Sequence, residues 1–500
     1  MKRVSTAIRS VLNIRGVHYA TIVFVIAFST RLIPELLSPN YPVGYDVAIY
    51  SYQVPHIHER PLPSLLRGTP MFYLIAWALL RATGIDVLLL LKLMGPLMYG
   101  LLMLSFYVFL RKALGWDRRW SLLCATICAL QVPALRLSWD LFRNELGLAM
   151  LFLFMASASG RSRPRWLITT LLALLTTLSH QLASVSMFIW SFFQIISARD
   201  RNREYMTKMV LCLLPSATLF SYQLAAYLGL LPPPAPVKVE RVIIRLQPPN
   251  PRANRPFTNY FLCANFLGTD YLGLVRTFLK LLLICYLPLC PLALMGLKRH
   301  RALDLLTVWF SIGAFSFLLC PQAYPFYSFF RWLMFLVFPI SAYAINGLAR
   351  IKSKTQYWRY VLACALIAYL LMGVSYASGT IYCINDEDVN AYLPWSLMQS
   401  TIGVGQIDDC IACLQWLNHH AGDNAVLITE QRFYAWALNF LDRRIAIAWY
   451  PHGYPIDLVP IASVLEEYEE AYLIWYSGYN VPGFREVFTS HDIAIYRVLA

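Results

Sequence analysis

Several ionisable and hydrogen-bonding side chains of this chain stand directly beside long apolar runs. Burial of such groups next to lipid costs free energy, so they mark candidate functional sites in a membrane protein. Carboxylates could transfer protons, and arginines suit phosphate groups. The candidates are Asp46 and Tyr50 in segment 44–50, Asp140, Arg143 and Glu145 in segment 138–145, then His180 and Arg331.

Asp46 is the candidate catalytic residue because its carboxylate could take a proton from an acceptor hydroxyl. The aromatic residues around it, Tyr45 and Tyr50, could stack on a sugar or anchor the loop. The alternative interpretation is that Asp46 caps a helix that starts near Val47.

The other candidates also have two interpretations each. If Asp140 starts a helix, Arg143 lies three residues on and is its neighbour, so the two could pair with each other or bind a metal or phosphate. Asp46 and Asp140 would be the ligands if a divalent cation, Mg or Mn, is used. His180 is a site residue or a hydrogen-bonded structural histidine. Arg331 binds a phosphate diester or extends to the membrane interface among aromatic residues.

The composition predicts a polytopic α-helical membrane protein. Of 500 residues, 58% are hydrophobic and 14% are charged, whereas soluble domains average about 25% charged residues. The net charge of +15 does not indicate nucleic-acid binding, because about half of the Lys and Arg residues lie in short loops between apolar runs. Topology and membrane lipids with anionic headgroups account for that charge.

The basic loops can all lie on one membrane face, which the positive-inside rule makes cytoplasmic. We therefore expect a plasma-membrane protein with a cytoplasmic N-terminus, retained as an anchor, and an extracytoplasmic C-terminal domain. The basic groups begin at Lys2, Arg111, Arg161, Arg199, Lys298 and Arg350.

Apolar runs near the spanning length of roughly 20 residues predict about eleven transmembrane helices. They are residues 17–36, 86–110, 120–137, 143–159, 166–184, 185–198, 206–230, 268–297, 302–320, 327–348 and 358–378. Segment 69–80 is apolar but too short to cross, so we place it at the outer interface.

We expect a membrane domain, 1–379, that carries two external loops, and a C-terminal α/β domain, 380–500. The first loop is 31–85. The second loop, 231–265, carries cations that could bind an anionic lipid or glycan phosphate, or could simply be solvated. Its residues 237–246 could pair as a strand or lie along the membrane. These cations are Lys238, Arg241, Arg245, Arg252 and Arg255.

Alternating apolar runs after residue 378 predict a largely parallel sheet with helices. We expect helices at 408–419, 432–442 and 458–470 and strands at 425–429, 445–449, 471–476 and 493–498. No G-x-G-x-x-G motif follows a strand, so nucleotide binding is not supported. Cys410 and Cys413 lack further ligands at zinc-finger spacing, which favours a disulfide or two ordinary thiols over a metal site.

This layout resembles the GT-C integral-membrane glycosyltransferases, such as protein O-mannosyltransferases and lipid A aminoarabinose transferases. The resemblance rests on Arg-Leu-Ile-Pro at 31–34, the Asp46 and Tyr50 pair, the Pro-containing segment 69–73, the acidic turn at Asp140 and the exported domain. It implies inverting transfer of a sugar from a polyprenyl- or dolichyl-phosphate donor, with Asp46 as the general base and Arg331 as a donor-phosphate ligand. The acceptor would be a protein, a lipid or a surface glycan.

The chain departs from relatives of that superfamily at several positions. Val47 follows Asp46 where many relatives have a second acid, the loop has no Asp-x-Asp, and the tail has no Trp-Trp-Asp-Tyr-Gly. Transfer of a whole oligosaccharide to asparagine is therefore disfavoured. Two interpretations from other classes stay open, namely a membrane transporter or lipid flippase and a non-catalytic membrane scaffold.

Overall fold

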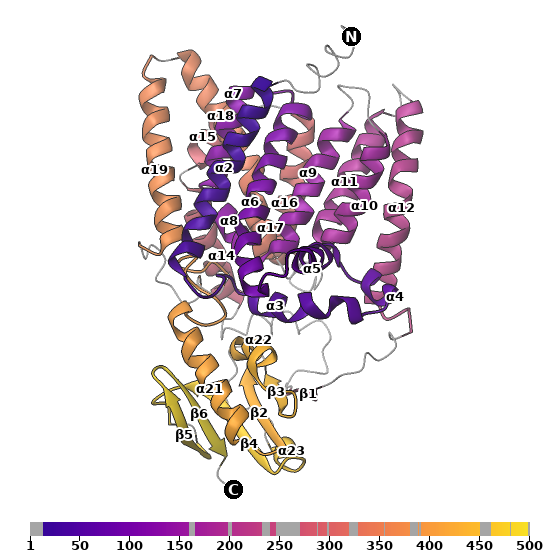
Figure 1. Ribbon diagram of the computed structural model, residues 1–500. Helices are drawn as coiled ribbons and strands as arrows, with labels where there is room; N and C mark the ends of the chain where they lie inside the picture. The colour runs from indigo at the N-terminus through magenta and orange to yellow at the C-terminus, as the bar shows by residue number, and fades with distance from the viewer. Residues whose placement is uncertain are drawn as a thin grey trace.

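The computed structural model describes residues 14–159, 166–198, 203–232, 241–246, 271–287, 289–297, 300–319, 329–354, 356–380, 389, 392–450, 462–480 and 482–498. A bundle of long helices forms one part of the molecule, and a smaller region that contains a β-sheet lies at one end of this bundle (Figure 1). The last described residues belong to the sheet region, and the first described helix, which begins at Ile14, starts at the opposite end of the bundle.

The bundle follows the predicted apolar runs. In the described part of the chain, five helices are long and apolar enough to cross a membrane, or six if one bent pair counts as a single span. The predicted number of eleven is therefore not confirmed. The bundle helices are α2 (Ile14–Leu37), α6 (Val87–Lys112), α7 (Arg118–Ala129), α8 (Val132–Asp140), α9 (Phe142–Ala158), α10 (Trp166–Ser179), α11 (Gln181–Ala198), α12 (Arg203–Tyr227), α14 (Tyr271–Tyr286), α15 (Cys290–Met295), α16 (Arg301–Leu319), α17 (Phe329–Phe335), α18 (Val337–Lys354) and α19 (Trp358–Ser378).

One predicted crossing is broken into two shorter helices. The run 120–137 forms α7 and α8, which meet at an angle of 64°. Pro133 stands in the first turn of α8, where the missing backbone N–H is tolerated but a continuous helix would be interrupted. Asp140 is the last residue of α8 and α9 begins at Phe142, so the condition under which Asp140 and Arg143 would be neighbours on one helix is not met.

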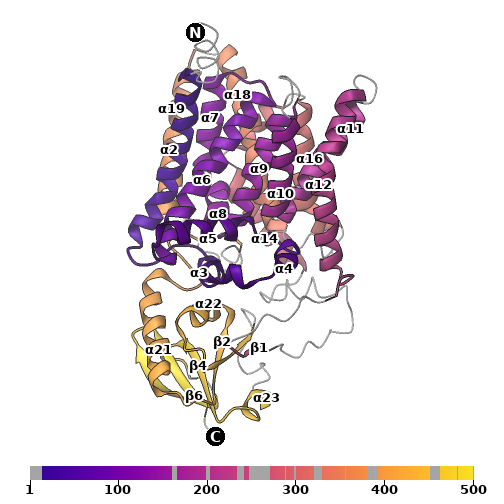
Figure 2. The ribbon, with the colours of Figure 1, turned by 45° about the vertical axis from the view of Figure 1, so that its right-hand side comes forward.

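The first loop, 31–85, is largely helical. It forms α3 (Val47–His56), the 3₁₀ helix η1 (Ile57–Glu59), α4 (Leu62–Leu66) and α5 (Met71–Thr83). These elements lie across the end of the bundle that faces the sheet region (Figures 1 and 2). At 13 residues, α5 is shorter than the roughly 20 residues that span the hydrocarbon core.

The six-stranded sheet has the order β1-β3-β2-β4-β6-β5. Pairing is parallel from β1 to β4, whereas β6 is antiparallel to both β4 and β5. Helices α21 and α22 pack against it. The elements are β1 (Ile243–Arg245), η4 (Val404–Gln406), α21 (Ile407–His420), β2 (Ala425–Glu430), α22 (Gln431–Phe440), β3 (Ala446–Tyr450), α23 (Ala462–Leu465), β4 (Glu470–Tyr476), β5 (Phe484–Ser490) and β6 (Ile493–Val498).

Most of this topology follows the predicted pattern, with two differences. Strand β5 is an addition, because its alternation of half-buried and exposed residues gives a weak apolar signal. Strand β1 comes from the second loop, so the sheet is not confined to residues 380–500, and one of the two interpretations of segment 237–246 is confirmed by its pairing with β3. The predicted helix 458–470 lies partly outside the described residues, and in the described part it is too long, because α23 ends at Leu465 and Glu470 already belongs to β4.

Candidate functional site

A cavity of about 350 Å³ opens beneath the first loop. It brings together three residues that the sequence had singled out, Asp46, Tyr50 and Arg143. The lining comes from α3, η1, α4, α5 and α9, so elements distant in sequence converge here. The other lining residues are Ile49, Gln53, Ile57, Arg60, Ser64, Leu65, Gly68, Thr69, Pro70 and Tyr73.

The backbone before Asp46 is held in one conformation. Gly44 has φ of +138°, and a Cβ atom there would stand 2.0 Å from the carbonyl oxygen of Trp139. The Gly44 N–H donates to Gln399 O at 2.9 Å, and Ser400 Oγ donates to Gly44 O at 3.1 Å. The turn that presents Asp46 is therefore fixed by α8 on one side and by the segment before α21 on the other.

The Asp46 carboxylate is not used as a helix cap. Asp46 occupies the N-cap position of α3, but its side chain makes no capping hydrogen bond. Tyr50 OH instead donates to Asp46 Oδ2 at 3.5 Å. The capping interpretation of Asp46 is therefore wrong, and its carboxylate lies at the cavity.

Tyr50 anchors the loop by its ring. The side chain is 2% exposed, and its ring lies 5.0 Å from Phe72, 5.7 Å from Tyr73 and 5.6 Å from Phe142, centroid to centroid. With its faces covered, the ring is not available to stack on a sugar. Of the two interpretations of the aromatic residues, Tyr50 follows the anchoring one.

Arg143 brings a positive charge from α9 to the same cavity. Its Nη1 donates to Thr69 Oγ1 at 3.5 Å, and its guanidinium lies 5.7 Å from the centre of the Tyr73 ring. Among the described residues, its buried Nε has no hydrogen-bond partner. A buried donor without a partner is costly, which suits a site that binds an anion.

Arg60 is a second cation of the cavity, and the sequence analysis missed it. Burial raises the pKa of the Tyr73 hydroxyl, while Arg143 and Arg60 lower it and Asp46 raises it further. All three charged residues therefore lie close enough to the Tyr73 hydroxyl to change its pKa. Arg60 lies in an irregular turn between η1 and α4. No sequence periodicity there indicates which way its side chain points, so only the tertiary structure shows that it lines the cavity.

Glu145, His180 and Arg331 do not line this cavity. Glu145 is fully buried in α9 and interacts electrostatically with Tyr99. His180 Nδ1 accepts a hydrogen bond from Leu182 N at 3.1 Å at the start of α11, and the charges of Arg331 and Arg143 both reach its ring. His180 is therefore close enough to both predicted phosphate ligands to feel their charges, but neither His180 nor Arg331 lines the cavity.

The described lining does not fit a divalent cation. Mg²⁺ and Mn²⁺ need several oxygen ligands, but the cavity presents one carboxylate, Asp46, together with the guanidinium groups of Arg60 and Arg143. Among the described residues no group of three His, Cys, Asp or Glu side chains could hold a metal. The side chain of Asp140 lies outside the described atoms, and we assign no step to a metal.

A buried ion pair stabilises the start of the first loop. Arg31 Nη1 donates to Glu35 Oε1 at 2.8 Å, and neither side chain is more than 2% exposed. Arg31 also donates to Ser138 O at 3.1 Å and Val43 O at 3.2 Å. Removal of either charge would leave the other unpaired in the interior. The pair therefore connects α2, α8 and the residues that precede Asp46.

A second polar cluster lies at the carboxyl ends of the parallel strands. Glu430 ends β2, and its Oε2 accepts from Arg432 Nε at 2.6 Å; Arg432 Nη1 donates to Tyr476 OH at 3.2 Å at the end of β4. Strands β3 and β4 lie on opposite sides of β2, and such a switch point is a usual place for ligands. Arg432 also interacts electrostatically with Tyr45, so this cluster lies near the turn that holds Asp46.

The cations of the second loop have a structural use where they are described. Arg241 is 7% exposed and donates to Ala437 O at 3.1 Å and Leu438 O at 3.4 Å, at the carboxyl end of α22. The Arg245 guanidinium lies 5.1 Å from the centre of the Trp449 ring. Lys238, Arg252 and Arg255 lie outside the described residues.

No family model matches this sequence, and no curated protein matches it. Solved structures do. The apo crystal structure of the oligosaccharyltransferase from Archaeoglobus fulgidus matches with 12% identity and a TM-score of 0.50, over 91% of this chain and 69% of that chain. The arabinofuranosyltransferase AftD from mycobacteria matches with 13% identity and a TM-score of 0.52, over 98% of this chain and 42% of that chain.

This chain shares its fold with these two glycosyltransferases. The GT-C resemblance predicted from the sequence is therefore supported at the level of the fold. The chain spans less than half the length of the AftD chain. At these identities the likeness is one of fold, and the activity is argued from the site.

Proposed function

We propose that this protein is a membrane glycosyltransferase that moves a sugar from a polyprenyl- or dolichyl-phosphate donor to an acceptor on the extracytoplasmic side. The observation that carries the proposal is the convergence of Asp46, Arg143 and Arg60 on one cavity at the end of the bundle. A base beside two cations suits the displacement of a phosphate by a hydroxyl. Both fold neighbours are glycosyltransferases, which supports glycosyl transfer in general.

The reaction is a single displacement at the anomeric carbon. The acceptor oxygen forms a bond to this carbon as the bond to the donor phosphate oxygen breaks, and Asp46 takes the acceptor proton. The lipid phosphate leaves with the bonding electrons, so negative charge grows on its oxygen. Arg143 and Arg60 stabilise that charge at the cavity, and Arg331 adds a longer-range contribution. Attack opposite the leaving group inverts the anomeric configuration.

The remaining residues position these groups. Tyr50 holds the Asp46 carboxylate through its hydroxyl, and His180 interacts electrostatically with both Arg143 and Arg331. Glu145, buried in the same helix as Arg143, orients that helix, and Asp140 ends the helix that supports the Gly44 turn. The acceptor, a protein, lipid or surface glycan, binds between the cavity and the cluster of Glu430 and Arg432.

The proposed orientation follows from the charges. The N-terminus and the basic loops face the cytoplasm of a cell with a plasma membrane, and the sheet region lies outside. Polar sugar chemistry at that face would take place in water while the donor lipid stays in the bilayer. This orientation is tested by labelling single cysteines introduced at exposed positions of α21 and of the α6–α7 turn.

Sugar transfer by the purified protein tests the function directly. The full chain is reconstituted in lipid and given a panel of labelled polyprenyl- and dolichyl-phosphate sugars with a crude envelope fraction as the acceptor. We expect transfer of label from at least one donor, and NMR of the product should show an inverted anomeric centre. Retention of configuration would contradict the single displacement, and no transfer from any donor would contradict the enzyme assignment.

A further inference from the structure

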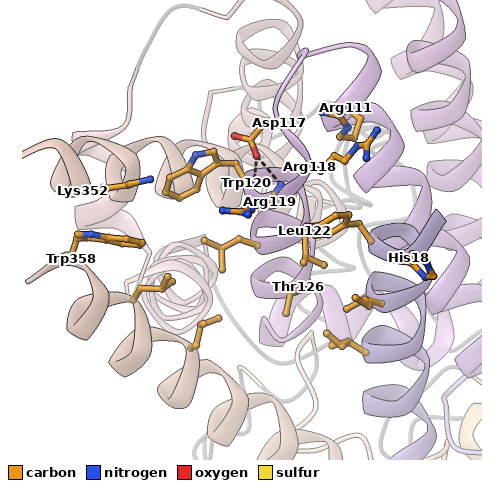
Figure 3. A pocket seen from close by; sticks show the side chains of 16 residues that line it. His18, Arg111, Asp117, Arg118, Arg119, Trp120, Leu122, Thr126, Lys352 and Trp358 are labelled. Atoms are coloured by element: carbon orange, nitrogen blue, oxygen red, sulfur yellow. Dashed lines mark hydrogen bonds between the residues drawn. The ribbon is translucent and has the colours of Figure 1, made fainter. Parts of the chain in front are cut away.

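A second and larger hollow lies at the opposite end of the bundle. It has a volume of about 1280 Å³ and is open to the surroundings. Figure 3 shows its lining side chains, which come from the starts of α2, α7 and α19 and from the ends of α6 and α18. Because the sheet region lies at the other end, this hollow is separate from the cavity of Asp46.

One part of this hollow is strongly cationic. Four of its lining residues are Arg111, Arg118, Arg119 and Lys352, and Asp117 is the only carboxylate in the described lining. Asp117 Oδ1 accepts from Arg119 N at 2.7 Å and from Trp120 N at 3.1 Å. The carboxylate therefore caps α7, and an excess of positive charge is left for a ligand.

Aromatic rings frame the cationic part. Lys352 Nζ lies 5.6 Å from the centre of the Trp120 ring and 5.1 Å from that of the Trp358 ring. Figure 3 shows the lysine beside both rings, with the arginines of α6 and α7 across from it. Tryptophan is enriched where a membrane protein meets the headgroup layer, so this arrangement marks the headgroup level.

The rest of the hollow is apolar. Its walls are the aliphatic side chains of Ile22, Ile26, Leu122, Leu123, Leu362 and Leu366. Ile22 is 44% exposed. In the most apolar stretch of α19, only 22% of the residues are buried inside the protein. These walls are therefore accessible from the surface that would face lipid tails.

We propose that this hollow binds one anionic phospholipid of the leaflet on this side. Its phosphate would lie among Arg118, Arg119 and Lys352, and its acyl chains against the walls formed by α2, α7 and α19. Basic pockets between transmembrane helices are known to take anionic headgroups. A soluble anion would leave the apolar walls uncovered, and an apolar helix would leave four cations without a counter-charge. Only an amphipathic anion complements both parts.

Lipid binding in this hollow is separate from sugar transfer, because the proposed donor site lies at the other end of the bundle. The bound lipid would join α19 to α2 and α7. The inference therefore does not depend on the proposed function, and its test measures lipid binding and not sugar transfer.

Native mass spectrometry of the purified full-length protein tests the proposal. Wild type is compared in phosphatidylglycerol and in phosphatidylcholine, and we expect retention of phosphatidylglycerol alone. In the variant R118Q/R119Q/K352Q we expect this binding to weaken on the order of tenfold or more. The matched control is K112Q/R203Q/R301Q, which removes three cations outside the lining of the hollow and should bind as wild type does.

A second measurement keeps the test informative if the triple variant is unstable. A phosphatidylglycerol with a photoreactive acyl chain is crosslinked to wild type and the attached peptides are sequenced. We expect labels at Leu122, Leu123 and Leu362. Equal retention of the two lipids, equal loss in the control variant, or labels spread evenly over the bundle would each overturn the proposal.

Discussion

Asp46, Asp86 and Asp117 each stand immediately before a helix, yet their carboxylates make different contacts. Asp86 and Asp117 accept hydrogen bonds from the first backbone N–H groups of α6 and α7. Asp46 makes no such bond and lies beside Arg143 at the cavity. The three have the same local sequence signature, so the sequence alone could not separate a cap from a catalytic candidate.

Arg143 is expected to stabilise the leaving phosphate. Arg143→Ala should lower kcat/KM by about a hundredfold, which corresponds to loss of one strong electrostatic contact in the transition state. Arg143→Lys should recover part of this loss because the charge is kept while the forked geometry is not. Steady-state transfer kinetics measure both.

The exposed Arg81 of α5 provides the control for this change, since Arg81→Ala removes a cation outside the cavity. Normal kinetics are expected for it. Full activity in Arg143→Ala would show that Arg143 has no part in the reaction.

Gly44 should be indispensable for the geometry of Asp46. Gly44→Ala places a Cβ atom against the Trp139 carbonyl in a backbone region that L-residues avoid. We expect loss of transfer and a lower melting temperature. Gly84→Ala is the matched comparison, because Gly84 also has positive φ, +67°, but has no atom within 4 Å of the added Cβ. If the two variants behave alike, the close contact at Gly44 is not important.

At the scale of elements, strand β1 shows what a local pattern can and cannot predict. Apolar runs at 425–429, 445–449, 471–476 and 493–498 predicted β2, β3, β4 and β6, because each strand buries apolar side chains within its own run. The sequence could suggest that 237–246 pairs as a strand, but its partner β3 is about two hundred residues away. The break between α7 and α8 was missed although Pro133 was visible, because the apolar run continues through it.

The candidate site was predicted to the same limited extent. Asp46, Tyr50 and Arg143 lie together as lining residues of one cavity. Arg60 and Arg432 were missed because each depends on how separate elements meet. Arg331 was chosen for its interfacial position, but it is not among the residues that line the cavity. A sequence shows which polar residues stand beside apolar runs. It does not show which residues from separate helices and strands come together in the fold.

Arg241 should stabilise the junction of β1 and α22. Its guanidinium donates to carbonyl groups at the carboxyl end of α22, so Arg241→Ala removes these charged hydrogen bonds from a buried site, at a cost of about 3 kcal/mol. We expect faster amide hydrogen exchange in α22 and β1. Arg245→Ala, which changes an exposed residue of β1, should leave exchange nearly unchanged. Equal protection in wild type and Arg241→Ala would refute the structural use of Arg241.

At the scale of the whole molecule, the bundle and the sheet region meet around the loop that holds Asp46. Asn439 Nδ2 donates to Ala48 O at 2.8 Å, and Trp139 Nε1 donates to Gln399 O at 2.8 Å. Tyr41 OH donates to Asp408 Oδ1 at 2.7 Å. The sheet region is therefore hydrogen-bonded to the loop that holds Asp46.

Asn439→Ala tests this arrangement. Loss of the bond to Ala48 should loosen α22 on α3, and we expect a several-fold rise in KM for the acceptor with little change for the donor. Asn418→Ala is the control because, in the described part of the chain, the Asn418 side chain bonds within the sheet region, to Phe440 O and Asp442 N. A rise in donor KM instead would show that the sheet region serves the donor.

Transfer by Asp46→Asn beside Asp86→Asn tests the central claim most directly. Both changes remove one carboxylate at a helix N-cap and keep the side-chain shape. We predict that Asp46→Asn folds, with an unchanged melting temperature, and loses transfer by at least about a hundredfold, while Asp86→Asn transfers normally. Normal transfer by a folded Asp46→Asn would contradict the assignment of Asp46 as the base and the mechanism built on it.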